Sequence, residues 1–269
     1  MQALSEALED SLKQTGTNIL FGQKVNSLSF DSIKRRWKVT AISKKENLDY
    51  YADDVIFTPP PQSLLKYLGH SLDRNHDYKK RIKNLPNPSG ALVFYSALKK
   101  AHIKSISSNH YQFVSDELGS LFVSISEDGD GRAPKGEITL IASLFTKTND
   151  WFNLDKHEYI KKKKEYIKNI SFALENQFEI SCENWLHKEL ATPLGFERWT
   201  NRPNGIVGGL GQNPEIFGLF GLSSRTPFKG LWLCGDSIYP GEGTAGVSQS
   251  ALMVSRQILA SKGINSFNL

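Results

Sequence analysis

Leucines recur every four positions at the start of the chain, at Leu4, Leu8 and Leu12, and Gly16 follows them. A spacing of four places these side chains on one face of a helix, and glycine is a common residue just past a helix end. The opening of the sequence therefore predicts an amphipathic helix that ends near Gly16.

Short apolar segments separated by polar turns come next, which is the pattern of β-strands. The last of them runs into Pro59, Pro60 and Pro61, and prolines cannot donate the hydrogen bonds of a sheet. We predict a domain boundary at this point, so that residues 1–61 form a first segment. Its expected strands lie at residues 19–21, 25–28, 37–41 and 55–57.

The pattern changes between residues 62 and 229, where strand candidates are divided by long polar loops. We predict an inserted domain on a mixed or antiparallel sheet, with strands at 91–98, 121–125 and 138–144. A helix is expected at 156–178, because Ile167, Ile170 and Leu174 share one side and lysines the other. The acidic, glycine-rich stretch 127–131 lacks the glutamate of an EF-hand, so a turn is expected there.

The stretch from Gly230 to Gly246 carries the most chemical information. Residues 231–234 form an apolar run short enough for a buried strand, and a helical period follows from Val247 to Ile258. The loop between them contains glycines at 235, 241, 243 and 246. A strand, a glycine-rich turn and a helix bring unpaired N–H groups together, so an anionic or electron-rich ligand is expected there.

Two other readings of this stretch fail on their context. Residues 241–246 spell G-x-G-x-x-G, but no acid follows Glu242 to bind a ribose, and the motif does not directly follow its strand. The run Gly235-Asp-Ser resembles a serine-esterase signature, but His187 is the last histidine, and that class places its base after the serine. A self-sufficient dinucleotide site and a serine hydrolase are both disfavoured.

Charge and composition limit the partners. The net charge of +5 comes from scattered lysines and a run at 161–164, which fits a solvated helix face or contact with anionic lipid. The sequence contains no nucleic-acid-binding module, and Cys182 and Cys234 lack metal-ligand spacing, so both are expected to be reduced and packed, without zinc. With no membrane-spanning run or signal peptide, a cytoplasmic or peripheral membrane location is expected.

Residues 231–258 resemble the C-terminal flavin motif of the phytoene-desaturase-like family, in which a strand ending in Gly-Asp precedes a proline-glycine loop and a helix. Residues 187–209 resemble the family's Thr-Pro segment, and 4–60 its middle region. The run Pro-Gly-Glu-Gly-Thr-Ala-Gly-Val is most similar to cyanobacterial carotenoid 3,4-desaturases. The sequence has no counterpart of the family's opening G-x-G-x-x-G strand and loop, so we interpret it as an N-terminally truncated chain, a split gene product or a decayed copy.

The resemblance implies an α/β fold: part of an FAD/NAD(P)-binding, glutathione-reductase-like domain without its N-terminal Rossmann motif, formed by 1–61 and 230–269, and a substrate domain at 62–229. It implies FAD as cofactor, with Asp236 at the ribityl or pyrophosphate region and the N–H groups of Gly246 and Val247 at the N1/O2 edge of the isoalloxazine. The other implied cofactor positions are Gly235, Gly241, Gly243 and, near the adenine, Val25.

The implied activity is carotenoid desaturation by hydride transfer to the flavin, with cis-trans isomerisation or a non-catalytic remnant or subunit as alternatives. Phe217, Phe220 and Leu222, with Leu219, are expected to line a polyene tunnel, although an ordinary core is an equal competitor. Arg198, Trp199 and Arg202 lie in the Thr-Pro segment, where surface pairing competes with a catalytic role. The implied partners are a polyene and a separate N-terminal chain, and no catalytic base is identified.

Overall fold

A computed structural model describes residues 2–86, 89–104, 106–127, 129–211 and 216–265, apart from the side chain of Leu219. The chain divides into two compact units. The first unit comprises Met1–Phe57, Gln62–Asn84 and Arg225–Leu233, and the second comprises Thr58–Pro61, Leu85–Ser224 and Cys234–Leu269.

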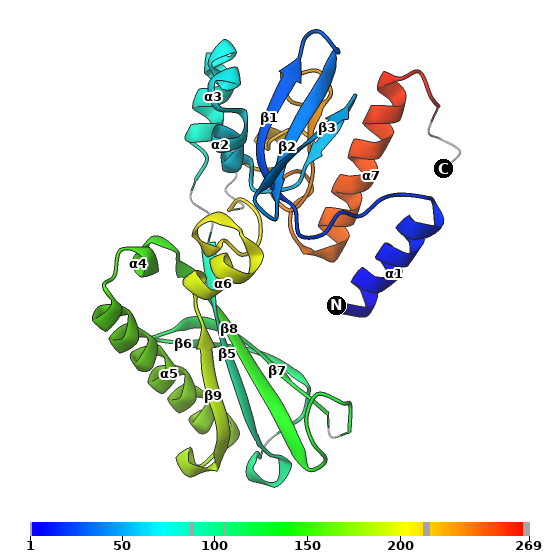
Figure 1. Cartoon of the computed structure of the whole chain (residues 1–269). Coiled ribbons are helices and arrows are strands. Elements are labelled where there is room, and N and C mark those ends of the chain that lie inside the picture. The colour runs from blue at the N-terminus through cyan, green and yellow to red at the C-terminus, as the bar shows by residue number, and fades with distance from the viewer. Residues whose placement is uncertain (1, 87–88, 105, 128, 212–215, 266–269) are drawn as a thin grey trace. The chain divides into compact units, whose positions relative to one another are not determined.

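The first unit combines a small antiparallel sheet with a parallel pair of strands and three helices (Figure 1). Its sheet has the order β1-β2-β3, and β4 pairs with β10 in parallel. The bounds are α1 Gln2–Gln14, β1 Lys24–Asp31, β2 Arg36–Ser43, β3 Glu46–Ala52, β4 Val55–Phe57, α2 Leu64–Leu68, α3 His76–Lys83 and β10 Leu231–Leu233.

Trp37 joins distant parts of the sequence within the first unit. Its side chain is 2% exposed, and its Nε1 donates a hydrogen bond of 2.9 Å to the carbonyl of Lys229. The next residue, Gly230, has a φ of +78°, and a Cβ there would collide with the Asp53 carbonyl and press on the Trp37 ring. Only glycine fits this position, which leads the chain into β10.

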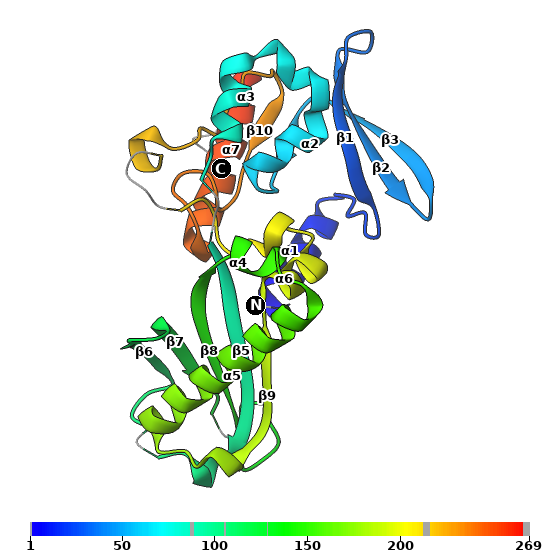
Figure 2. The same cartoon turned by 90° about the vertical axis from the view of Figure 1, so that its left-hand side faces the viewer.

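The second unit is built on a five-stranded antiparallel sheet of order β6-β7-β8-β5-β9. Two helices, α4 and α5, pack on one face of the sheet through a core that includes Trp151, Ile170 and Leu174 (Figures 1 and 2). The bounds are β5 Ser89–Lys99, β6 His110–Ser115, β7 Gly119–Ile125, β8 Glu137–Lys147, α4 Asn149–Phe152, α5 Lys156–Phe178, β9 Trp185–Ala191, α6 Pro193–Thr200 and α7 Gly243–Ser261.

Local signals set both ends of α5 where the sequence predicts them. Asp155 accepts a hydrogen bond from the Glu158 amide, and the Glu158 carboxylate accepts one from the Asp155 amide, which together make a capping box. At the other end Glu179 adopts a left-handed conformation with a φ of +50°. Buried Ile170, Leu174 and Phe178 form the expected apolar side of the helix.

The strand predictions hold where apolar residues are buried and fail elsewhere. The strands expected at 25–28, 37–41, 55–57, 91–98, 121–125 and 138–144 all lie within observed strands. The strand expected at 19–21 is wrong: no strand forms there, and Leu20 and Phe21 are 53% and 74% exposed. Three strands were not predicted, namely β3, β6 and β9, because their side chains are mostly exposed or half-buried.

The compact units differ from the predicted boundaries at four places, of which 58–61 and 225–229 are short and 62–84 and 234–269 are long. Residues 62–84, expected in the substrate domain, belong to the first unit, where Leu64, Leu72 and Ile82 are fully buried. Residues 234–269, expected with the flavin-binding portion, belong to the second unit. The change of unit at Cys234 falls where β10 ends and the glycine-rich loop begins.

The expectation for the two cysteines holds only in part. Both cysteines are free thiols, but Cys182 is exposed, so its expected packing is wrong, while Cys234 is half-buried. None of the described helices combines the length and apolar character that crossing a membrane requires. Within the described ranges no three His, Cys, Asp or Glu side chains are grouped to hold a metal ion.

Candidate functional site

The glycine-rich loop runs from Gly235 to Glu242 and connects the end of β10 to α7. The amide of Gly235 donates a hydrogen bond of 3.1 Å to the Ser250 hydroxyl on α7, which ties the start of the loop to the helix that follows it. Gly241 has a φ of +120°, a conformation that side chains rarely allow. The expected strand, glycine-rich turn and helix are therefore all present, although Cys234 lies outside the strand.

The N-terminus of α7 lies earlier than expected, and this corrects two predicted contacts. The helix begins at Gly243 with Glu242 as its N-cap, and the Glu242 side chain does not cap it. Only the first N–H groups of a helix lack an intrahelical acceptor. The N–H groups open to a ligand are thus those of residues 243–245, whereas those of Gly246 and Val247 lie within the hydrogen-bonded helix.

Gly246 has a steric role instead. A Cβ at this position would collide with the backbone of Gly241, so the first turn of α7 and the loop lie in direct contact. Gly243, in contrast, has open space beside it, with nothing within 4 Å of a Cβ built there. The loop is therefore closed on the Gly246 side and open beside Gly243.

We expect Gly246→Ala to destabilise the chain by about 1–3 kcal/mol, because the added methyl must displace the Gly241 backbone. The matched control is Gly195→Ala in α6, where a Cβ meets nothing within 4 Å. That change should be neutral or stabilising by about 0.5–1 kcal/mol, because alanine is the better helix former. Urea unfolding of both variants measures the difference, and equal midpoints would contradict the close packing at Gly246.

Asp236 is the central charged residue of the loop. Its side chain is 16% exposed and forms an ion pair with Arg202, with 2.8 Å between Nη2 and Oδ2. The Ser237 hydroxyl donates a hydrogen bond of 3.2 Å to Oδ1, which agrees with the turn hydroxyl expected for Ser237. The same Nη2 of Arg202 donates to the carbonyl of Gly208 at 2.7 Å.

The segment around Gly208 and Gly209 packs onto the glycine-rich loop. A Cβ on Gly209 would collide with the backbone of Asp236 and Ser237, and one on Gly208 would collide with the Glu242 carboxylate. The Gly209 amide donates a hydrogen bond of 3.4 Å to that carboxylate. The end of the Thr-Pro segment and the flavin-like motif, far apart in sequence, thus form one polar cluster.

Sequence reasoning missed most of this cluster. Surface pairing was one of the two possibilities left open for Arg202, but its partner was not identified, and Glu242 was not assigned a role. Arg198 lies 5.6 Å from the ring of Trp199, whose side chain is 81% exposed. The glycine pair at 208–209 was the available signal, because adjacent glycines indicate a close approach of backbone.

The remaining predicted site residues lie elsewhere. Val25 lies on β1 in the first unit, opposite Ala41 and 37% exposed. Phe217 is half-buried, Phe220 is 67% exposed and Leu222 is 3% exposed, all in an irregular segment of the second unit. Leu222 is therefore a core residue, while the side chain of Leu219 lies outside the described part of the chain.

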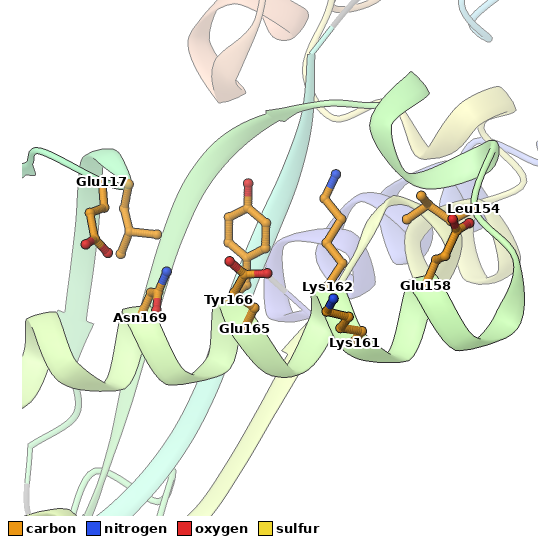
Figure 3. Close-up of a pocket in the computed structure, with 9 residues that line it drawn as sticks. Glu117, Leu154, Glu158, Lys161, Lys162, Glu165, Tyr166 and Asn169 are labelled. Atoms are coloured by element: carbon orange, nitrogen blue, oxygen red, sulfur yellow. The ribbon is translucent and has the colours of Figure 1, made fainter.

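A separate hollow of about 440 Å³ lies along α5 (Figure 3). Its walls carry charges of both signs, including Glu158, Lys161 and Glu165 on α5 and Glu117 on the hairpin of β6 and β7. Lys162 donates to the carbonyl of Asp150 at 2.9 Å. The lysine run therefore does not present one uniform basic face, and the hollow lacks the apolar lining of a typical small-molecule pocket.

The sequence shows weak similarity to known proteins. No protein-family model matches the sequence. The chain is 24% identical over 273 residues to the chloroplastic prolycopene isomerase of Arabidopsis thaliana, covering 97% of this chain and 45% of that protein. It is 30% identical over 149 residues to that of Daucus carota, covering 54% of this chain and 24% of that protein. The chain spans less than half the length of these relatives.

Solved structures share its fold. An oxidoreductase from Methanosarcina mazei matches with a TM-score of 0.63 at 16% identity, covering 93% of this chain and 53% of that one. Cyclohexylamine oxidase from Brevibacterium oxydans matches with 0.52 at 12%, covering 87% and 48%. Aklavinone-11 hydroxylase, solved with FAD and aklavinone, matches with 0.51 at 11%, covering 97% and 41%.

The chain has the fold that these parts of oxidoreductases share. The predicted fold class, part of an FAD-binding α/β domain with an antiparallel substrate sheet, is thereby confirmed. A likeness to carotenoid enzymes is also confirmed at the level of weak sequence similarity. The named relatives are plant isomerases, so the closer likeness to cyanobacterial 3,4-desaturases stays a prediction.

Proposed function

We propose that the chain is the cofactor- and substrate-binding part of an FAD-dependent oxidoreductase that acts on a carotenoid-like polyene. The observation that carries this proposal is the loop from Gly235 to Glu242, which contains the largely buried, paired Asp236 and leads into the uncapped N-terminus of α7. The similarity to prolycopene isomerases supports the substrate class.

The residues of the loop fit the reactive end of a flavin. Open N–H groups at 243–245 and the positive end of the α7 dipole suit the electron-rich N1/O2 edge of the ring system. The space beside Gly243 admits a flat ring, and the Asp236 carboxylate suits the ribityl hydroxyls. Bound FAD would supply the hydride acceptor, while this chain orients both reactants and excludes water.

The face of the sheet opposite α5 suits an uncharged hydrocarbon. Cross-strand register places Tyr95, Ile141 and Phe122 on this face, and Tyr95 and Phe122 are 40% and 46% exposed. The positions of β5, β7 and β8 on this face over 91–97, 120–124 and 139–145 carry no charged side chain. We propose that the polyene, which carries no charge, lies on this strip of β5, β7 and β8. Glu189 and His187 of β9, opposite Tyr95 and Ala97, border the strip.

We also propose that residues 217–222, which the sequence predicts to line a tunnel, contact the polyene. Phe217 and Phe220 retain enough exposure to contact a ligand, whereas Leu222 supports the segment from inside. Val25 remains a proposed adenine contact on the first unit. A separate chain that supplies the ADP-binding half of the site, and contact with a membrane surface, are further proposals consistent with an apolar substrate.

Desaturation is the leading reaction, and the prolycopene isomerase relatives favour isomerisation as the second candidate. The two differ in stoichiometry, because desaturation removes two hydrogens and isomerisation removes none. Incubation with FAD and a cis-carotenoid, followed by mass spectrometry and chromatography, decides between them. A product two mass units lighter indicates desaturation, unchanged mass with a new isomer indicates isomerisation, and no product supports a non-catalytic subunit.

We expect the 269-residue chain to bind FAD and FMN with similar, weak affinity, roughly micromolar or weaker. The contacts proposed above all address the isoalloxazine and ribityl end, and FMN contains this end without the ADP half. Titration followed by flavin fluorescence measures both dissociation constants. Much tighter binding of FAD than of FMN would mean that this chain also contacts the ADP half. That result would contradict the proposal that a separate chain supplies those contacts.

A further inference from the structure

We infer that Arg202 is a positioning residue of the flavin site, which fixes the Asp236 carboxylate and balances its charge beside the helix N-terminus. This inference rests on the proposed function, because it names a further residue of the same site. It depends on three observations: the contacts of the guanidinium, the packing of the loop that carries it and the charge at the start of α7.

The guanidinium joins two segments through one terminal nitrogen. Nη2 of Arg202 lies 2.8 Å from Oδ2 of Asp236 and donates to the Gly208 carbonyl at 2.7 Å. Both side chains are largely buried, with exposed fractions of 27% and 16%. An ion pair shielded from solvent in this way holds its geometry better than an exposed one, so one carboxylate oxygen has a fixed position.

The backbone around Arg202 leaves little room for another arrangement. The turn at Pro203–Gly205 follows it directly, and Gly205 packs so tightly on Pro193 that a Cβ would collide with the Pro193 backbone. Gly209 then touches the backbone of Asp236. Arg202 is thus anchored at α6 on one side and at the glycine-rich loop on the other.

The positive charge of Arg202 neutralises the Asp236 carboxylate. An uncompensated carboxylate in the loop that leads into α7 would oppose an electron-rich ligand that the open N–H groups of 243–245 attract. Arg202 balances that charge at Oδ2, while Oδ1 accepts the Ser237 hydroxyl and keeps the capacity to accept a further hydrogen bond from a ligand. In addition, Nε of Arg202 is buried and has no hydrogen-bond partner among the described residues, so the cluster holds an unused donor.

Four variants of the full chain test this role: Arg202→Ala, Arg202→Lys, Asp236→Asn, and the double variant Arg202→Ala/Asp236→Asn. We expect Arg202→Ala to weaken FAD binding about tenfold or more, because the carboxylate loses both its fixed position and its counter-charge. Arg202→Lys should fall between the wild type and Arg202→Ala, since lysine keeps the charge but not the planar fork.

The double variant separates charge balance from simple support. An asparagine at 236 carries no charge, so the double variant should bind FAD more tightly than Arg202→Ala alone. Fluorescence titration with FAD measures all four affinities. Equal affinity of Arg202→Ala and the wild type, or no recovery in the double variant, would overturn the inference while leaving the proposed function intact.

Hydrogen–deuterium exchange without flavin tests whether Arg202 positions Asp236 even if the wild type binds no FAD. Failure of the inference can then be distinguished from failure of the proposed function. Arg202→Ala and Asp236→Asn should each accelerate amide exchange at 202–209 and 235–242 about tenfold, and the double variant should add little, because both remove the same link. Unchanged exchange in these loops would show that Arg202 does not position Asp236, whatever the outcome with flavin.

Discussion

Ile141→Lys is expected to weaken polyene binding about 100-fold or more while FAD affinity stays at the wild-type level. Ile141 lies opposite Tyr95 in the part of the open face that β5, β7 and β8 form, where the described positions carry no charged side chain. A lysine there can reach water in the ligand-free chain, but a bound polyene would cover it without offering a partner, at a cost of several kcal/mol. Absorbance titration with a solubilised carotenoid measures this loss.

The matched control is Ile33→Lys in the turn between β1 and β2, which adds the same charge in the first unit. Ile33 is 94% exposed, so a lysine there remains solvated. It should change polyene affinity less than about threefold. Equal losses in both variants would indicate a general effect of added charge and would contradict a binding surface centred on Ile141.

The tunnel predicted from the sequence gives the competing outcome. Phe220 is 67% exposed, so Phe220→Asp should fold normally, with a melting temperature close to that of Phe220→Leu. If Phe220→Asp removes polyene binding and Ile141→Lys does not, the polyene binds at residues 217–222, and its assignment to the sheet face around Ile141 is wrong. If both variants lose binding, the two surfaces belong to one site.

Asp236→Ala is expected to reduce FAD affinity by about tenfold to 100-fold, with a smaller effect on folding. The carboxylate is the only charged group of the loop that we assign to the ribityl hydroxyls, and hydrogen bonds to a charged group contribute about 1.5–3 kcal/mol. The variant also removes the Asp236 carboxylate from Arg202 and leaves its hydrogen bond to the Gly208 carbonyl, so some loss of stability is expected. Flavin titration and thermal unfolding separate the two effects.

Asp53→Ala provides the control for removing a paired carboxylate. Asp53 accepts from Arg36 at 2.9 Å in the first unit, in a more exposed pair. Its loss should leave FAD affinity unchanged and cost at most about 1 kcal/mol. Equal FAD affinity in wild type and Asp236→Ala would reduce Asp236 to a structural residue.

Local patterns predicted the parts of the fold whose cause is local. Both ends of α5 follow from Asp155, Glu158 and the apolar period, and the three prolines mark the end of β4. β9 was not predicted because His187, Lys188 and Glu189 are exposed consecutive polar residues that form a strand only by pairing with β5. Such tertiary pairing has no periodic signature.

The candidate site was predictable to a similar extent. The glycines and Asp236 mark the loop directly, because their chemistry is visible in the sequence. The start of α7 was placed four residues late, at Val247, because Gly243 and Gly246 are poor helix formers, and here close packing of Gly246 on Gly241 outweighs that preference. The pair of Arg202 with Asp236 depends on how two distant loops fold together, which spacing along the chain does not record.

Hydrogen–deuterium exchange of the full chain with and without saturating FAD tests the central claim most directly. If the flavin binds at the glycine-rich loop, FAD should slow amide exchange at residues 235–245, including the open N–H groups at the start of α7, and leave α5 unchanged. Protection confined to other segments, or none at a concentration where FAD fluorescence reports binding, would contradict the assignment of this loop as the flavin site.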